Sequence, residues 1–198
     1  MDAASYACAV DLASLCAAFG LSAAAGLNAW LPLFAGALAQ RLDLVDLAQP
    51  FDDLSGTGAL VVLGVLTIAD FVGDKIPAVD HVLHAIGTVV APASGAVLFT
   101  GQTGADTDLP TLAAILLGAG TAESIHAGRA AIRPISTATT AGLGNPVLSV
   151  LEDLGALGLT LAAFIVPVLA AAAVIALVVV IVVPWLRRRP AADSAGHA

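Results

Sequence analysis

The last apolar run of the chain constrains its fold more than any other feature. From Leu154 to Val183 the sequence contains no charged side chain, and a helix needs only about 20 residues to cross the ~30 Å hydrocarbon core of a bilayer. Trp185 follows, and then Arg187–Arg189. An aromatic ring with cations beyond it is typical of the cytoplasmic end of a membrane helix. The sequence therefore predicts an integral membrane protein.

The composition extends this prediction to the whole chain. Hydrophobic residues make up 59% of the 198 residues and charged residues 11%, whereas a typical soluble domain contains about 25% charged residues. Because the deficit is not confined to one segment, we expect a single integral membrane domain over residues 1–189, a disordered tail over 190–198, and the lipid bilayer as a partner. The net charge of −8 argues against nucleic acid as a partner, because nucleic acid requires a basic surface.

The apolar segments predict an all-α fold, a polytopic transmembrane helix bundle with five or six spanning segments. Gly26, Asn28 and Pro32 together favour a break in the first segment. A later stretch, which begins and ends with proline, is rich in hydroxyl groups and too polar for a lipid-facing helix. We expect broken or re-entrant helices near 26–32 and 134–146, with lesser interruptions at 91–95 and Pro167.

The basic residues orient the predicted helices. Cytoplasmic loops of membrane proteins carry an excess of Lys and Arg. Six crossings place on the cytoplasmic side Lys75, Arg129, Arg133 and Arg187–Arg189, and they leave Arg41 outside. A topology with five crossings agrees less well with the cytoplasmic excess of Lys and Arg, but it remains an alternative. We therefore expect a multi-pass protein of the cell (inner) membrane with both termini in the cytoplasm.

The densest polar cluster follows the second apolar segment. It consists of Asp70, Asp74, Lys75, Asp80, His81 and His84. Ionisable groups within or beside membrane helices are costly, so they are candidates for function. Asp70 and Asp74 share a face if the helix continues that far, and so do Asp80 and His84. The alternative is an interfacial loop in which Lys75 pairs with one aspartate.

A polar stripe marks the fourth apolar segment. Its members are Glu123, His126, Arg129 and Arg133, which fall within an arc of about 120° on a helix. The spacing of Glu123 and His126 occurs in carboxylate-bridged metal sites of helix bundles, although a Glu–His ion pair is the alternative. Weak metal candidates are therefore Asp80, His84, Glu123 and His126. Arg129 and Arg133 also suit the cytoplasmic, negative end of this helix. No cofactor is identified.

A third group flanks the predicted helix breaks and contains Asn28, Asn145, Glu152 and Asp153. Unwound backbone inside a membrane must be satisfied by other protein groups, water or a ligand. Half-helix ends of this kind form substrate and ion sites in transporters. A polar loop that packs against the bundle is the alternative.

Four sequence blocks carry a family resemblance. They are 26–30 (GLNAW), 74–80 (DKIPAVD), 126–133 (HAGRAAIR) and 144–153 (GNPVLSVLED). The chain resembles a family of small bacterial multi-pass membrane proteins that is known only as an uncharacterised domain of unknown function. That family usually has Glu at the Asp70 position and a basic residue near Ala91, and the chain departs from it at Ala91. The resemblance implies a membrane protein but no activity.

Three functions are consistent with these features. We expect a small transporter or channel-like protein that moves a small solute or cation through an interior polar site. One alternative is an intramembrane enzyme acting on a lipid or isoprenoid headgroup. It requires the polar cluster after the second apolar segment and the polar stripe of the fourth to lie at the same depth in the membrane. The other alternative is a non-catalytic membrane assembly factor. The solute and the oligomeric state are not specified by the sequence.

Overall fold

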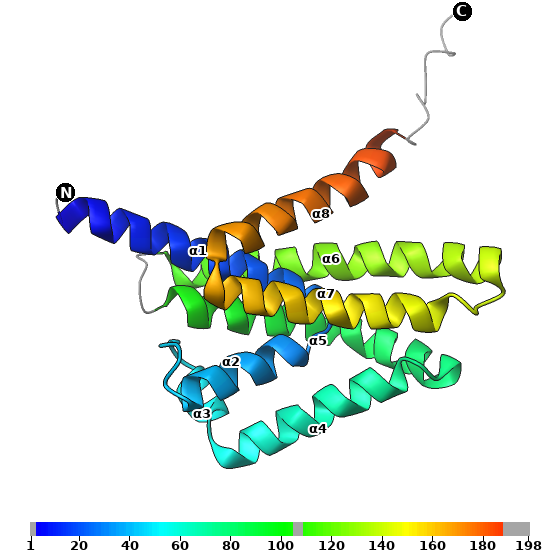
Figure 1. The fold of residues 1–198 in the computed structure, drawn as a ribbon, viewed down its shortest axis with the longest axis horizontal. Helices are drawn as coiled ribbons and strands as arrows, with labels where there is room; N and C mark the ends of the chain where they lie inside the picture. Colours follow the sequence, from blue (N-terminus) through cyan, green and yellow to red (C-terminus); the bar gives the residue numbers. More distant parts are fainter. Residues whose placement is uncertain (1–2, 105–108, 188–198) are drawn as a thin grey trace, which may run out of the picture.

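The computed structural model describes residues 3–104 and 109–187, with the side chains of 3–11, 77, 78, 80, 81 and 181–187 left out (Figure 1). The described residues form eight α-helices and no strand, which confirms the all-α prediction. The helices are α1 (Ala3–Leu27), α2 (Leu31–Arg41), α3 (Phe51–Leu54), α4 (Thr57–Gly73), α5 (Pro77–Thr103), α6 (Thr111–Thr140), α7 (Asn145–Ile165) and α8 (Pro167–Arg187). The predicted tail, 190–198, lies outside the described residues.

Helix α1 forms the centre of the bundle. It contacts α2, α5, α6, α7 and α8, and nearly every side chain from Ala17 to Asn28 is buried. Most of these side chains are those of Ala, Gly and Ser, which let neighbouring backbones approach closely. A Cβ added at Gly26 would lie 2.4 Å from the carbonyl oxygen of Ala122 on α6. The small residues of α1 therefore allow four long helices to pack around it.

Helices α5 and α6 cross at two glycines. A Cβ at Gly95 would lie 2.5 Å from the Gly118 carbonyl oxygen, and a Cβ at Gly118 would lie 2.4 Å from the Gly95 carbonyl oxygen. Ser22 of α1 donates a 3.0 Å hydrogen bond to the Gly95 carbonyl. This crossing holds α5 along α6, and α5 continues through Pro92 without ending. The expected interruption at 91–95 was wrong, because packing on both sides supports the helix there.

The two predicted breaks have different outcomes. The first is confirmed, because α1 ends at Leu27 and α2 begins at Leu31. The second lies later than expected, because α6 continues through Pro134 as far as Thr140. Ala141 and Gly142 then take positive φ values of 52° and 85°, the left-handed conformation that commonly ends a helix. The hydroxyl-rich stretch is therefore mostly helical, and a turn at 141–144 joins α6 to α7.

The last apolar run is not one continuous helix. Val166 has φ −141° and ψ 74°, which separates α7 from α8. Pro167 explains the break, since the residue before a proline is pushed away from helical geometry and proline donates no hydrogen bond. Figure 1 shows that α8 turns back at this point and leaves the bundle at an angle to α7. The predicted interruption at Pro167 is confirmed as a full break, whereas the interpretation of 154–183 as a single spanning helix was wrong.

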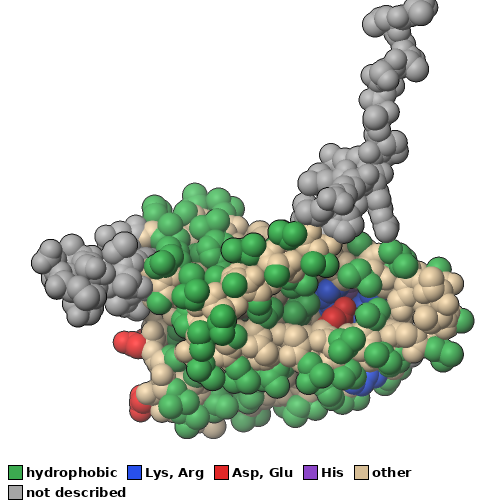
Figure 2. Space-filling view, turned by 45° about the horizontal axis from the view of Figure 1, so that its top comes forward, with side chains coloured by type: hydrophobic (Ala, Val, Ile, Leu, Met, Phe, Trp, Pro, Cys, Tyr) green, Lys and Arg blue, Asp and Glu red, His purple; other side chains and the backbone are tan. Residues whose placement is uncertain are grey.

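Aliphatic side chains cover much of the outer surface (Figure 2). On α4, for example, Val61, Val65 and Ile68 are 60–65% exposed. Among the described side chains, two helical stretches are long and apolar enough to cross a membrane, Val82–Thr103 and Asn145–Ile165. Shorter apolar helices are Leu12–Leu27, Thr57–Gly73 and Pro167–Val180. The structure thus supports membrane association by length and composition, without fixing five or six spans.

Candidate functional site

Most of the ionisable side chains in the predicted groups gather toward one end of the bundle. The junction of α4 with α5 and the turn between α6 and α7 lie at this end (Figure 1). Two ionic clusters and one cavity occupy the space between these elements. Adjacent residues of α7, Glu152 and Asp153, take part in different clusters.

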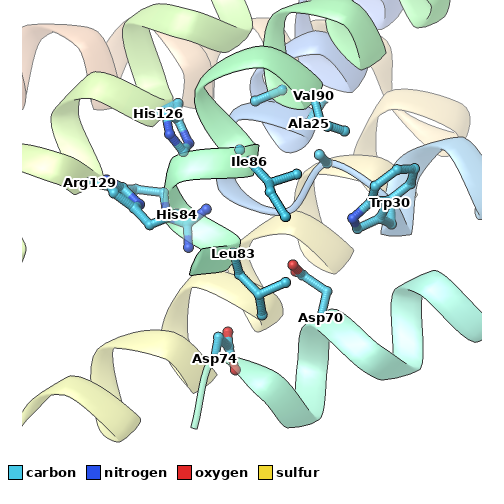
Figure 3. Close-up of a pocket in the computed structure, with 13 residues that line it drawn as sticks. Ala25, Trp30, Asp70, Asp74, Leu83, His84, Ile86, Val90, His126 and Arg129 are labelled. Carbon is cyan, nitrogen blue, oxygen red and sulfur yellow. The ribbon is translucent and has the colours of Figure 1, made fainter. Parts of the chain in front are cut away.

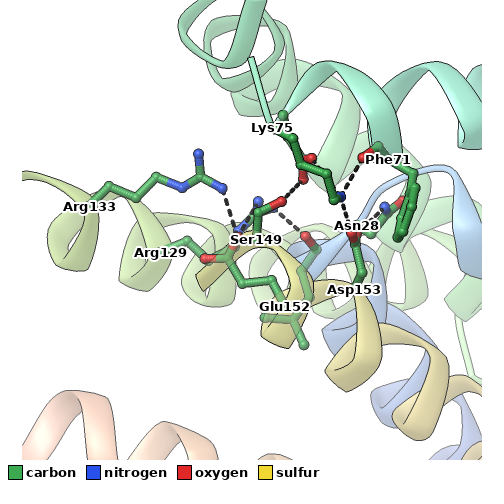
Figure 4. Close-up of polar contacts among 10 residues, drawn as sticks. Asn28, Phe71, Lys75, Arg129, Arg133, Ser149, Glu152 and Asp153 are labelled. Carbon is green, nitrogen blue, oxygen red and sulfur yellow. Dashed lines mark hydrogen bonds and ion pairs between the residues drawn. The ribbon is translucent and has the colours of Figure 1, made fainter. Parts of the chain in front are cut away.

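The first cluster joins α4 to α7 and to the end of α1. We call it the Lys75 cluster, and it contains Asn28, Asp74, Lys75, Ser149 and Asp153 (Figure 4). The Lys75 Nζ lies 3.2 Å from Asp74 Oδ1 and 3.3 Å from Asp153 Oδ2. Ser149 donates a hydrogen bond to the other oxygen of Asp74. Asn28 Nδ2 donates to the other oxygen of Asp153 at 3.0 Å.

The Lys75 cluster is closed, because every oxygen of its two carboxylates has a partner. Asn28 also uses its Oδ1 to accept hydrogen bonds from the backbone N–H groups of Trp30 and Leu31, at 3.1 and 3.0 Å. This contact satisfies donors at the start of α2, which a helix N-terminus leaves free. The ammonium of Lys75 lies 3.6 Å from the centre of the Phe71 ring. The cluster therefore connects α1, α2, α4 and α7 and has no free ligand position.

The second cluster joins α6 to α7 and also reaches α1. We call it the Arg129 cluster, and it contains Arg129, Arg133 and Glu152. Nη2 of Arg129 and Nη2 of Arg133 lie 2.7 and 2.8 Å from the same oxygen, Glu152 Oε2. Nη1 of Arg129 donates to the Leu27 carbonyl at the C-terminal end of α1. The alternative interpretation of the arginines as markers of the end of their own helix was wrong, because α6 continues to Thr140.

A small cavity lies between α4, α5 and α6, next to both clusters (Figure 3). It has a volume of about 40 Å³. Its ionisable lining residues are Asp70, Asp74, His84, His126 and Arg129, and its apolar lining includes Trp30, Leu83 and Val90. The Asp70 side chain forms no hydrogen bond or ion pair among the described residues. The cavity therefore has both a carboxylate without a partner and a basic wall.

Two histidines form one wall of this cavity. The rings of His84 and His126 are stacked, with centroids 4.7 Å apart and an angle of 23° between their planes. His126 is buried, and its Nε2 has no hydrogen-bond partner among the described residues. A Cβ at Gly87 would lie 2.7 Å from Cε1 of His126, so only glycine leaves room for this ring. A buried nitrogen of this kind requires an acceptor or donor, such as a ligand or water in the cavity.

The structure brings the first two predicted groups together. His84 of the first group stacks on His126 of the second, and both face the same cavity as Asp70. The third group divides, because Asn28 and Asp153 belong to the Lys75 cluster and Glu152 belongs to the Arg129 cluster.

Two predicted residues belong neither to the cavity lining nor to either cluster. Glu123 has a buried Oε2 with no hydrogen-bond partner in the described part of the chain. Asn145 lies at the start of α7 and donates to Thr137 Oγ1 at 3.0 Å. The side chain of Asp80 is outside the described residues, and the described ones contain no group of three His, Cys, Asp or Glu side chains that could hold a metal ion.

Comparison with protein families gives one match. A family model described as a domain of unknown function (DUF4126) matches residues 15–187. The chain belongs to this family. All the predicted site residues of this DUF4126 protein lie within the matched range, and the family description names no activity. No curated protein and no solved structure matches the chain.

Two contributors to the site of this DUF4126 protein were not predicted. Gly87 makes room for His126, and the Leu27 carbonyl accepts from Arg129. The predicted break near Gly26 could have indicated the contact between Arg129 and the Leu27 carbonyl. The last carbonyl groups of a helix need hydrogen-bond donors, and they attract cations. Gly87 carried no such signal in the sequence, since its role depends on a ring from another helix.

Proposed function

We propose that the chain is a multi-pass membrane protein that moves protons or a small cation through the cavity between α4, α5 and α6. One observation carries the proposal. The Asp70 carboxylate and the His126 Nε2, both without partners among the described residues, face one water-sized space inside an apolar bundle. Groups of this kind inside a membrane protein are expensive, and they mark ion and proton pathways.

The distribution of side chains supports placement in a bilayer. Aliphatic residues are exposed on the outside, whereas Asn28, Asp74, Arg133 and Asp153 are buried. This arrangement is the reverse of the one expected in water, where charged side chains are mostly exposed. Lipid as the surrounding medium accounts for it.

The helix directions support an orientation. Lys75 at the junction of α4 with α5, the two arginines of α6 and the C-terminal end of α8 lie toward one end of the bundle (Figure 1). The acidic segment 42–56 lies at the other end together with the start of α1. The excess of basic residues at the first end supports a cytoplasmic placement of that end. We therefore propose an external N-terminus and a cytoplasmic C-terminus, in place of two cytoplasmic termini.

The size of the cavity limits what can occupy it. A water molecule needs roughly 10–15 Å³ of such space, so about 40 Å³ accommodates a few waters or one small ion. An organic solute would need a larger space. Of the two cargo classes expected from the sequence, the structure favours a proton or small cation.

Reconstituted vesicles test the proposal. We expect vesicles that contain the protein to carry a proton or monovalent-cation flux, measured with internal dyes, that empty vesicles lack. Asp70→Asn removes the charge of the unpaired carboxylate and is expected to lower this flux at least about tenfold, since a fixed charge at the path is lost. The matched control is Glu123→Gln, which neutralises a buried acid that does not line the cavity, and it should retain most of the flux.

Two results would contradict the proposal. One is a wild-type flux no greater than that of empty vesicles for protons and for every small cation tested. The other is an unchanged flux in Asp70→Asn. Gly87→Ala gives an independent test, because the added methyl group must displace the His126 ring without changing any charge. We expect it to reduce the flux as well.

The enzyme alternative has one supporting observation. An enzyme of this kind requires the ionisable residues near the α4–α5 junction to lie close to those of α6. The stacking of His84 on His126 meets that condition. Hydrolysis of a labelled lipid or isoprenoid phosphate by the purified protein, lost in His126→Ala, would favour this alternative over transport.

A further inference from the structure

One carboxylate of the cavity lining is not held in an ion pair. Asp74 pairs with Lys75 at 3.2 Å. Arg129 pairs at 2.7 Å with Glu152, which lies outside the cavity and lines an apolar groove between α6, α7 and α8. The Asp70 side chain has no hydrogen bond or ion pair among the described residues. A positively charged particle that enters the cavity therefore has Asp70 as its binding group.

The side chains of the lining offer few oxygen ligands for a metal cation. Asp74 already uses one oxygen with Lys75 and the other with Ser149. Asp70 is the other carboxylate, and the remaining polar lining consists of two imidazoles, an indole and a guanidinium, which carry nitrogens. Calcium and magnesium take six or more oxygen ligands, and potassium channels replace the hydration shell of the ion with rings of carbonyl oxygens. Most of the cavity wall is helical, so its backbone carbonyls are engaged within the helices.

The volume of the cavity also disfavours a hydrated metal cation. About 40 Å³ accommodates roughly three waters, because each needs roughly 10–15 Å³ of such space. An ion with a full shell of about six oxygen ligands, as magnesium requires, would need more room if those ligands were waters. A proton needs neither a shell nor several ligands, since it binds to a single oxygen or nitrogen atom.

We infer that the cargo of this cavity is the proton and that metal cations are excluded, an inference that rests on the proposed transport function. Asp70 and His126 face the same water-sized space from α4 and from α6 (Figure 3). Protonated Asp70 gives its proton to a water in the cavity, and this water passes one of its own protons to the lone pair of His126 Nε2, in the tautomer that carries hydrogen on Nδ1. The products are a carboxylate, an imidazolium and an unchanged water, so atoms and charge balance.

Ion replacement in reconstituted vesicles tests the inference with the wild-type protein. Under an inward proton gradient, with a permeant anion to compensate charge, a pH dye inside the vesicles should report a proton flux above that of empty vesicles. We expect the same flux when external Na⁺ is replaced by K⁺ or N-methylglucamine, and uptake of labelled Na⁺ and Rb⁺ no greater than in empty vesicles. A proton flux that requires Na⁺ or K⁺ would overturn the inference.

The same measurements distinguish this inference from the proposed function. Uptake of Na⁺ or Rb⁺ that is lost in Asp70→Asn would overturn the exclusion of metal cations but would support transport through the cavity. The absence of every flux would contradict both.

His126→Gln separates proton transfer from cation binding. Glutamine offers an amide oxygen that could coordinate a cation, but it does not take up and release a proton. We expect the proton flux to fall at least about tenfold, since a positioned proton acceptor is lost. The matched control is Glu123→Gln, which introduces the same side chain on α6 outside the cavity lining and should retain most of the flux. Equal proton fluxes in the two variants would overturn the inference, and the wild-type ion replacement decides it if His126→Gln does not fold.

Discussion

The Lys75 cluster and the Arg129 cluster begin at neighbouring residues of α7 but are organised differently. Asp153 faces α1 and α4, where its two oxygens bind Asn28 and Lys75. Glu152 faces α6, where one oxygen binds two arginines beside an open groove. Adjacent residues on a helix point about 100° apart, so one pair of acids contributes to two separate surfaces.

The difference separates structural charges from those available to a ligand. In the Lys75 cluster each carboxylate oxygen has a partner, so the buried charges fix four helices relative to one another. In the Arg129 cluster two guanidinium groups share one oxygen of Glu152, and the Nε of Arg129 has no hydrogen-bond partner among the described residues. Burial alone therefore does not separate the two kinds of charge in this chain, whereas unsatisfied hydrogen-bonding capacity does.

Asp153→Ala should have the largest effect on stability. It leaves the Lys75 ammonium with one carboxylate and removes the acceptor of Asn28, and loss of one partner from a buried ion pair costs about 3–5 kcal/mol. We expect a loss of about 3 kcal/mol in the free energy of unfolding, measured by titration with a denaturing detergent. Asp153→Asn, which retains an acceptor for Asn28, should lose less. A destabilisation below about 1 kcal/mol in Asp153→Ala would show that the Lys75 cluster does not stabilise the packing of α1, α2, α4 and α7.

Glu152→Gln should have a smaller effect on stability than Asp153→Ala. The variant leaves two arginines without their shared carboxylate, which should lower the unfolding free energy by about 2 kcal/mol. The same titration with a denaturing detergent measures this loss. An unfolding free energy equal to that of the wild type would show that the Arg129 cluster does not stabilise the packing of α6 against α7.

Ser149→Ala should have the smallest effect of the three. It removes one hydrogen bond to Asp74 and leaves both ion pairs of Lys75 in place. A hydrogen bond to a charged group contributes roughly 1.5–3 kcal/mol, and we expect a loss near the lower limit because Lys75 still compensates Asp74. A loss as large as that of Asp153→Ala would contradict this ranking and show that the Ser149 hydrogen bond stabilises the cluster as much as the ion pairs of Lys75 do.

The sequence predicted the helical segments better than their ends. Gly26, Asn28 and Pro32 fall together and correctly indicated the first break. Three other prolines were harder to interpret, since α5 continues through Pro92 and α6 through Pro134, whereas the chain breaks before Pro167. A proline removes one donor in every case. Whether the helix continues depends on neighbouring helices, which a single sequence does not contain.

The same limit applies to the candidate site. Charge scarcity selected the residues that the structure gathers in the two clusters, because each buried charge must be matched by another group. The sequence could not assign the partners. Glu123 and His126 share a helix face but have different surroundings, and the partner of His126 is a ring from α5. Partners of this kind are set by helix crossings at Gly87, Gly95 and Gly118.

The position of α1 has a consequence for biosynthesis. Ribosomes make this helix before the helices that enclose it, because α5 to α8 follow it in the chain, from Pro77 onward. Until they are inserted, its alanine- and serine-rich face has lipid or an insertion factor as its neighbour. Premature termination after α4 would therefore leave the innermost helix uncovered, and such fragments are expected targets of membrane-protein quality control.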